Sequence, residues 1–401
     1  MNNMNMPLEG IRVLDFSMFL SGPRASQLLA DFGAEVVKVE PPGGETMRLW
    51  MMLIPDQEES MTHWHRGKKG ISVEIRKPEG AELMKKLVPR FDVLIENLAP
   101  GTMDRCGLSY QELKKINPRL IYCSISGFGK DAPRSHRVAF DIIAQATGGI
   151  MAAQRAEHRS PGVFFGDLVS GAYAAFGILT ALRRRDQTGE GQLVDISMQD
   201  VMYFQNFRAF QVRMHKNMDQ IKETLGGSFE DLFTSPEGLP FWRPYQARDG
   251  YVAVVFLTDR QWQAMCDIIG KPEYKSDERF ANLIQRVKNR ELIRDELNAW
   301  MEARSAAEIE KVLDEHRIPC GRVLSTGEAN EDLNLKARGM IAEVEAEDGH
   351  RIPSPGIPIK LSETPGRLRG RGPSVGEHNA EVYGEYLGLS TPVHKFGNVF
   401  C

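Results

Sequence analysis

The first half of the chain alternates short apolar strand patterns with helical ones, and this alternation constrains the fold most. Residues 11–16 (IRVLDF) predict a strand, and residues 34–40 (AEVVKVE) predict the next one. Between them a Ser-Gly-Pro turn leads into a helix, because Pro23 suits a first helical turn and Gly33 suits a helix end. The pattern repeats with strands at 70–75, 91–97 and 120–127 and helices at 79–88 and 109–116. It predicts an α/β fold with a doubly wound parallel sheet.

Ligands of such sheets bind beyond the carboxyl ends of the strands. The loops expected at that edge are residues 17–23, 41–46, 97–105 and 127–141. We therefore expect the functional residues of the chain to come from these loops.

The pattern weakens from about residue 203 to 245, where Gly and Pro are frequent. A strand at 251–256 and helices at 259–269, 289–303 and 306–316 then predict a second α+β unit. A hairpin that turns at Asp348 and Gly349 is expected near the end. The predicted organisation is a large domain of residues 1–203 plus 325–401, a linker of residues 204–245, and a small α+β domain of residues 246–324.

Residues 163–182 (VFFGDLVSGAYAAFGILTAL) form an apolar stretch long enough to span a bilayer, and three arginines follow it. Asp167 interrupts the stretch, which is rich in Gly and Ala, so we predict a fully buried core helix and no membrane partner. The chain begins without a signal-peptide pattern, and its five cysteines are widely spaced. A cytoplasmic location is expected. The net charge of −4 provides no global field for nucleic acid.

Three other patterns are weak. The segment GFGKDA (residues 127–132) is followed by Pro133, which favours a flexible loop over a dinucleotide site. His63 and His65 have no evident third ligand, so a surface pair is predicted rather than a metal site. A basic cluster is either a solvated face or a site for a small phosphate-bearing ligand, and comprises Arg66, Lys68, Lys69, Arg76 and Lys77, with Arg105, Arg134 and Arg137.

Asp167 lies at the start of the long apolar helix, between Gly166 and Gly171. It could simply cap the helix N-terminus. Alternatively, a partly desolvated carboxylate there could act as a nucleophile or a general base. The sequence pattern alone leaves both interpretations open.

Many segments of the chain, in order, resemble class III CoA-transferases of the formyl-CoA transferase and CaiB/BaiF type. They include PLEGIRVLDFSMFLSGPRASQLLADFGAEVVKVEPPGG, VLIENLAPGTMDRCGLSYQELKKINPRLIYCSISGFG, FDIIAQATGGIM, GDLVSGAYAAFGILTALRRRDQTGEGQLVDISMQD, RIPCGRV and GEHNAEVYGEYLGL. The resemblance implies a Rossmann-like large domain, a smaller α+β domain and an interlocked dimer, formed with a second copy or with a homologous chain.

The resemblance also implies a reaction. Asp167 is the expected catalytic residue, and its carboxylate attacks an acyl-CoA thioester to give a mixed anhydride and CoA thiolate. An aspartyl-CoA thioester follows, and an incoming carboxylic acid completes the exchange. Coenzyme A then enters as part of the acyl-CoA substrate, no metal is needed, and succinyl-CoA is one candidate donor.

CoA contacts carried over from the family fall on eleven positions. They are Leu20, Ser21, Val73, Arg76, Asn97, Leu98, Arg105, Arg137, Val138, Phe140 and Asp141, with Arg105 as a phosphate partner. Pro41 stands where some members have an arginine. The tetraglycine loop of formyl-CoA transferase is not apparent around residues 225–240.

Two alternatives remain. The α-methylacyl-CoA racemases of this family have a histidine immediately before the aspartate that is Asp141 here, whereas this chain has Phe140. Two-base proton exchange would lack one partner. The chain could also be a non-catalytic subunit of a hetero-oligomeric transferase. An apolar acyl pocket could be formed by Phe19, Trp50, Met51, Met52 and Phe140, unless these residues only pack in the core.

Overall fold

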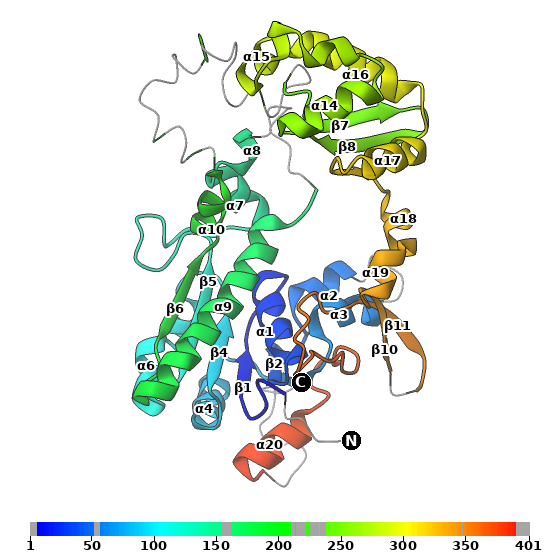
Figure 1. Ribbon diagram of the computed structural model, residues 1–401. Helices are drawn as coiled ribbons and strands as arrows, with labels where there is room; N and C mark the ends of the chain where they lie inside the picture. The colour runs from blue at the N-terminus through cyan, green and yellow to red at the C-terminus, as the bar shows by residue number, and fades with distance from the viewer. Residues whose placement is uncertain are drawn as a thin grey trace. The chain divides into compact units, whose positions relative to one another are not determined.

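The computed structural model describes residues 6–51, 57–153, 162–207, 209, 213, 222–223, 232, 238–346 and 348–389. The chain divides into two compact units (Figure 1). The first comprises Met1–Ile150, Ser160–Gln205 and Leu333–Cys401, and the second comprises Met151–Arg159 and Asn206–Asp332.

A six-stranded parallel sheet forms the centre of the first unit, as the strand–helix alternation predicts. Its order is β3 (Lys68–Ser72), β2 (Glu35–Glu40), β1 (Arg12–Asp15), β4 (Val93–Glu96), β5 (Ile121–Ser126) and β6 (Leu193–Ser197). The order runs outward in both directions from β1 and β4, so a crevice opens at their carboxyl ends. Strand β6 was not predicted, because this edge strand is mostly half-exposed and carries Asp195 amid its apolar residues.

Alternating side chains of the strands pack into two separate apolar layers. Val93 and Ile95 of β4 pack with α1 (Ser21–Asp31), α9 (Phe165–Thr188) and α10 (Met198–Gln205). Leu94 of the same strand points to the opposite layer, with α4 (Pro78–Leu87), α6 (Tyr110–Ile116) and α20 (Asn379–Leu387). The period of two along each strand thus covers both faces of the sheet.

Helix α9 is the one helix among the described residues that is long and apolar enough to cross a membrane, judged by length and composition alone. The prediction that it is fully buried is wrong. Ala174, Ile178 and Ala181 pack in the core, but the side chains of Phe176 and Leu179 are 69% and 42% exposed. One face packs against α1, β5 and β6, and the other face is apolar and exposed.

Helices α1 and α9 approach each other closely at Gly171. A Cβ atom at this position would lie 2.5 Å from the carbonyl oxygen of Ser21 and 2.9 Å from Cβ of Arg24. Only a residue without a side chain permits this separation. The contact places the first turn of α1 beside the first turns of α9.

The second unit contains an antiparallel sheet in the order β7 (Trp242–Ala247), β8 (Gly250–Val255), β9 (Cys320–Arg322). Helices α14 (Asp259–Ile268), α16 (Arg290–Glu302) and α17 (Ala306–Glu315) share its core. Strand β7 begins inside the segment 204–245, which we expected to be a linker. The prediction missed this strand because Pro244 is unusual inside a strand. The expected hairpin is confirmed as β10 (Ile341–Glu345) and β11 (Arg351–Pro355), and it belongs to the first unit.

The Gly171 contact predicts a selective loss of stability. Gly171→Ala should lower the free energy of unfolding by about 1–3 kcal/mol, because the added methyl group meets backbone atoms that cannot move aside easily. Urea denaturation measures this loss. Gly43→Ala is the matched control, since a Cβ atom at Gly43 meets nothing within 4 Å, and it should change stability by less than about 0.5 kcal/mol. Equal effects of the two substitutions would contradict the close helix contact.

Candidate active site

A cavity of about 320 Å³ opens at the carboxyl edge of the parallel sheet, and Asp167 lies in its wall. The remaining walls are built by residues from the segments 18–21, 97–100, 125–127 and 137–140, together with Met198. These segments lie at or beyond the carboxyl ends of β1, β4 and β5, so the cavity lies where doubly wound sheets bind ligands. Of the predicted site residues, the cavity brings together Ser21, Asn97, Leu98, Arg137, Val138, Phe140 and Asp167.

Asp167 does not cap its helix. The N-cap of α9 is Phe164, which makes no side-chain capping bond, and Asp167 lies in the first helical turn. Its backbone N–H donates a hydrogen bond of 3.1 Å to Oδ1 of Asp141. Asp141 is held in turn by Gln145, whose Nε2 donates to Oδ2 over 2.6 Å. The predicted CoA contact Asp141 therefore lies buried behind Asp167.

The environment of Asp167 makes its carboxyl group unusually basic. The residue is only 8% exposed, and burial together with the nearby charge of Asp141 raises its pKa from 3.8 to about 7. A hydrogen bond from Ser21 acts in the opposite direction. At neutral pH the side chain is therefore divided between acid and carboxylate, and the ionised form is poorly solvated. A carboxylate in this state is suited to nucleophilic or general-base chemistry.

Asn97 ties the loop after β1 to the loop after β4. Its Oδ1 accepts from the Met18 N–H over 2.7 Å, and its Nδ2 donates to the Met18 carbonyl over 2.8 Å. The same Nδ2 donates to Oγ of Ser21 over 3.0 Å. Asn97 therefore positions Ser21, whose hydroxyl contacts Asp167.

Two aromatic rings form one wall of the cavity. Phe19 and Phe140 meet edge to face, with ring centroids 5.3 Å apart. The other aromatic candidates do not join them, since Trp50 is 61% exposed and neither it nor Met51 lines the cavity. Met52 lies outside the described residues, as does most of the segment 225–240, in which no tetraglycine loop was apparent.

A second cavity of about 430 Å³ adjoins the first and shares Leu98, Ala99, Pro100 and Ser126 with it. Arg105 lies beside this cavity, because its Nη2 donates to Oγ1 of Thr102, a lining residue, over 3.0 Å. Burial raises the pKa of the Cys106 thiol, and the charges of Arg76 and Arg105 act to lower it. The two exposed guanidinium groups therefore lie near the same thiol.

Part of the basic cluster is structural. Arg66 is buried and pairs with Asp31 over 2.7 Å, and Lys68 is buried and pairs with Asp15 over 3.0 Å. Neither side chain is available to a ligand. The prediction of a surface histidine pair is also wrong for His65, which is fully buried. The segment GFGKDA forms a loop, as predicted, since no helix lies between β5 and α7 (Asp141–Thr147).

Leu20 and Val73 are buried and line neither cavity. Residues that sequence reasoning missed include Lys38, Glu45 and Gln145, which are buried at or behind the site. A signal existed for one of them, because Lys38 interrupts the apolar pattern of its strand with a charge.

The raised pKa of Asp167 predicts that its ionised form destabilises the folded protein. Replacement of Asp167 by Asn should raise the free energy of unfolding at pH 8 by about 2–4 kcal/mol. The gain should shrink as the pH falls from about 7 toward 4, because the folded protein then binds a proton at Asp167 before the unfolded chain does. Urea denaturation at several pH values measures it. The exposed Asp131→Asn variant is the control, and a gain that is constant between pH 5 and 8 would contradict the raised pKa.

The sequence of the chain is similar to a family of known proteins. The family model described as CoA-transferase family III matches residues 8–379. A succinyl-CoA–D-citramalate CoA-transferase from Chloroflexus aurantiacus is 35% identical over 396 residues, which cover 96% of this chain and 95% of that protein. A formyl-CoA:oxalate CoA-transferase from Streptomyces avermitilis is 35% identical over 400 residues, which cover 96% of this chain and 97% of that protein.

Solved structures of similar fold point to the same family. The crystal structure of a CaiB/BaiF family protein from Brucella suis matches with a TM-score of 0.79 at 32% identity, covering 96% of this chain and all of that one. The Mycobacterium tuberculosis protein Rv3272 matches with a TM-score of 0.81 at 26% identity, covering 94% of this chain and 98% of that one. With the family model spanning both units and relatives aligned over nearly their full length, the chain belongs to CoA-transferase family III.

Proposed function

We propose that this protein transfers CoA from an acyl-CoA thioester to a carboxylic acid, with the side chain of Asp167 as the covalent carrier. The observation that carries the proposal is a carboxyl group of raised pKa in the wall of a cavity at the carboxyl edge of the sheet. Family III of the CoA-transferases acts on CoA thioesters, which supplies the substrate class.

The side chain of Asp167 carries first the acyl group and then CoA through the exchange. Its carboxylate attacks the thioester carbonyl, the C–S bond breaks, and CoA leaves as a thiolate from a mixed anhydride. The thiolate then attacks the aspartyl carbonyl, which releases the donor acid as a carboxylate and leaves an aspartyl-CoA thioester. The acceptor carboxylate attacks that thioester to give a new anhydride and thiolate. Attack of the thiolate on the acceptor carbonyl forms the new acyl-CoA and regenerates Asp167.

The two adjoining cavities support the binding of an elongated thioester. The reacting carbonyl would lie beside Asp167 in the smaller cavity, and the pantetheine arm would extend past the shared wall into the larger one. Arg76 and Arg105 would pair with the CoA phosphates, since exposed guanidinium groups bind phosphate oxygens well. Arg137, in the wall of the smaller cavity, is a further cation along this path.

A racemase would need a second proton-transfer group opposite Asp167. Among the described residues that line the smaller cavity, Asp167 is the one carboxylate, and no histidine is present. Phe140 occupies the position of the expected imidazole and packs against Phe19. This arrangement favours the transferase over the enolising reaction.

The donor we propose is the CoA thioester of a short acid, with succinyl-CoA first among candidates. One relative is named for succinyl-CoA and D-citramalate, and another is named for formyl-CoA and oxalate. Both names describe small acids, and a cavity of about 320 Å³ accommodates a small acyl group beside the thioester.

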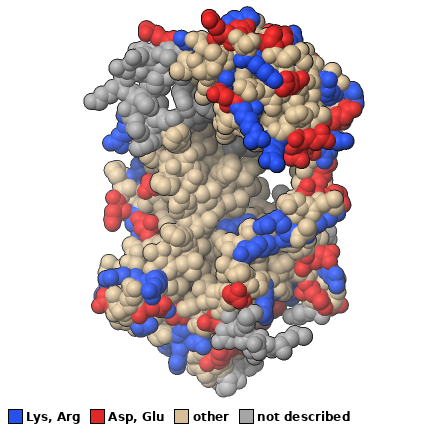
Figure 2. Space-filling model, viewed as in Figure 1, with Lys and Arg blue, Asp and Glu red and all other residues tan. Residues whose placement is uncertain are grey.

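We propose further that two copies of the chain form a dimer that covers the exposed apolar face of α9 and α10. Phe176 and Leu179 on α9 and Tyr203 and Phe204 on α10 are all more than two-fifths exposed. Figure 2 shows few charged side chains along this part of the surface. Exposed apolar clusters of this kind mark association surfaces.

Sedimentation equilibrium should therefore give twice the mass of one chain. Phe176→Asp should shift the protein toward the monomer, because a buried charge at the interface has no partner. Leu333→Asp is the control, since Leu333 is 80% exposed on α19 (Leu333–Ala337), away from this cluster in sequence. A wild-type monomer at micromolar concentration would contradict the dimer.

The covalent carrier is tested by intact-protein mass spectrometry after incubation with a panel of acyl-CoAs and trapping with hydroxylamine or borohydride. Wild-type protein should be modified at Asp167, and the Asp167→Ala variant should show neither modification nor turnover. Since only the carboxylate reacts, modification should increase with pH up to about 7 and then level off.

The Arg105→Ala variant serves as a control for binding. It should still be modified at saturating acyl-CoA but should need a higher concentration, because Arg105 is assigned to phosphate binding and not to the reacting atoms. Turnover retained in Asp167→Ala would overturn the mechanism. Racemisation or deuterium exchange at Cα without an acceptor acid would favour the enolising alternative.

A further inference from the structure

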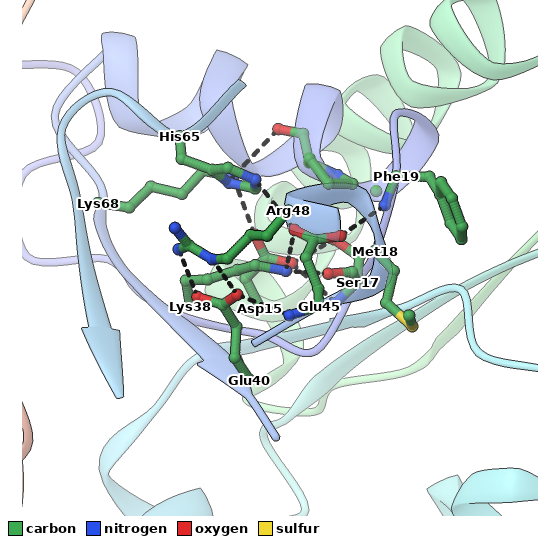
Figure 3. A network of polar contacts seen from close by, with 12 residues as sticks. Asp15, Ser17, Met18, Phe19, Lys38, Glu40, Glu45, Arg48, His65 and Lys68 are labelled. Atoms are coloured by element: carbon green, nitrogen blue, oxygen red, sulfur yellow. Dashed lines mark hydrogen bonds and ion pairs between the residues drawn. The ribbon is translucent and has the colours of Figure 1, made fainter. Parts of the chain in front are cut away.

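A network of buried charged side chains lies directly behind the site loop, which we define as residues 17–21. Figure 3 shows its members gathered in one place, and they come from β1, β2, β3, the helices α2 (Thr46–Met51) and α3 (Gln57–His65), and Glu45 in the segment just before α2. The carboxylates are Asp15, Glu40 and Glu45, the cations are Lys38, Arg48 and Lys68, and His65 completes the set. Three negative charges thus face three positive ones.

His65 is neutral in this network. Burial and the charge of Lys68 lower its pKa to about 4. Lys68 Nζ lies 3.2 Å from Nδ1 of His65, and an ammonium group can only donate, so Nδ1 is the acceptor nitrogen. The ring proton is therefore on Nε2, which lies 3.1 Å from Oε1 of Glu45.

The network holds the backbone of the site loop. Asp15 Oδ1 accepts from the Ser17 N–H over 3.0 Å, and the ammonium group of Lys38 donates to the Ser17 carbonyl. Glu45 Oε2 accepts from the Phe19 N–H over 2.8 Å. Together with the two bonds from Asn97 to Met18, buried or half-buried side chains bind the backbone of three successive residues.

Phe19 is held in a conformation that its side chain disfavours. Its φ angle of 59° lies in the left-handed region, which phenylalanine rarely adopts and glycine adopts without steric strain. In this conformation the Phe19 ring meets Phe140, and Ser21 follows two residues later at Asp167. Glu45 itself is only 1% exposed, and Oε1 lies 3.1 Å from Lys38 Nζ.

We propose that Glu45 is a positioning residue of the active site, which keeps Phe19 left-handed and thereby sets the cavity wall and the place of Ser21 beside Asp167. The expected fall in kcat rests on the proposed function. The role of Glu45 in holding the site loop rests on the geometry alone. Glu45 does not touch the cavity and acts only through the loop.

The contacts of Glu45 suit a carboxylate better than an amide. The Phe19 N–H donates a hydrogen bond to Oε2 of Glu45, and Lys38 Nζ and His65 Nε2 each lie 3.1 Å from Oε1 without meeting hydrogen-bond geometry. A glutamine has one acceptor oxygen and one amide nitrogen that donates. If its oxygen faces Lys38, its nitrogen opposes the Phe19 N–H, and if its oxygen faces Phe19, its nitrogen opposes the Lys38 ammonium group, so neither orientation keeps both contacts.

The Glu45→Gln variant tests the proposal by two independent measurements. Hydrogen-exchange mass spectrometry should show faster exchange in a peptide that covers residues 16–22. Turnover should fall by about 10- to 100-fold in kcat, because small displacements of a catalytic group are costly. The KM for acyl-CoA should change by less than about threefold, since the phosphates bind elsewhere.

Glu45→Asp provides a second variant that retains the charge balance and hence the fold. Its carboxylate is shorter by one methylene group and cannot reach both Phe19 and Lys38, so it should show the same two effects. The matched control is Asp31→Asn, which breaks the buried pair with Arg66 at the far end of α1. Asp31→Asn should lower the stability of the protein. Its kcat should stay within about twofold of wild type, and hydrogen exchange in residues 16–22 should be as slow as in wild type.

A double-mutant cycle tests the role of Phe19. Glycine adopts the left-handed conformation without strain. In a Phe19→Gly background, the loss of kcat caused by Glu45→Gln should therefore shrink to less than about fivefold. An equal loss in both backgrounds would show that Glu45 does not act through Phe19.

The outcomes separate this inference from the proposed function. Unchanged exchange in residues 16–22, or faster exchange with kcat within twofold of wild type, overturns the positioning role of Glu45. Wild-type protein that neither transfers CoA nor forms an adduct overturns the proposed function, and the exchange data still decide whether Glu45 holds the loop.

Discussion

The close contact between α1 and α9 at Gly171 is the constraint on which the site depends. It brings the Ser21 carbonyl within reach of α9 and so fixes the first turns of both helices at the crevice between β1 and β4. Asp167 lies buried in the first turn of α9, and burial makes its carboxyl group basic enough to be divided between two protonation states near neutral pH. The reactivity of the site is therefore mainly a product of burial, to which the charge of Asp141 adds.

A reactive carboxylate placed in this way is unfavourable for folding, and the surrounding structure offsets only part of the cost. Asp141 lies behind Asp167 and raises its pKa further, whereas Ser21 donates a hydrogen bond that lowers it. Gln145 holds Asp141 in place. A fully neutralised Asp167 would be more stable but less nucleophilic, so the two opposing influences leave it basic and still ionisable.

The parallel sheet and the hairpin could be predicted from the sequence because their apolar periodicity and turn residues are local signals. The family resemblance pointed to Ser21, Asn97 and Phe140, and the structure brings them together. The exposed face of α9 and the burial of His65 could not be predicted, since both depend on which neighbours the fold supplies. Arg66 and Lys68 look like ligand-binding cations in sequence, but their partners Asp31 and Asp15 are distant along the chain.

The left-handed Phe19 gives the buried network a structural role. Glycine would adopt the same backbone angle freely, but it would remove the ring that forms the cavity wall against Phe140. A phenylalanine at this position needs its backbone held by neighbouring groups, and Glu45 and Lys38 of β2 bind the loop backbone here. Buried carboxylates there require cations of equal number, which Lys38, Lys68 and Arg48 supply. The network therefore follows from the demand for an aromatic side chain at a position whose conformation favours glycine.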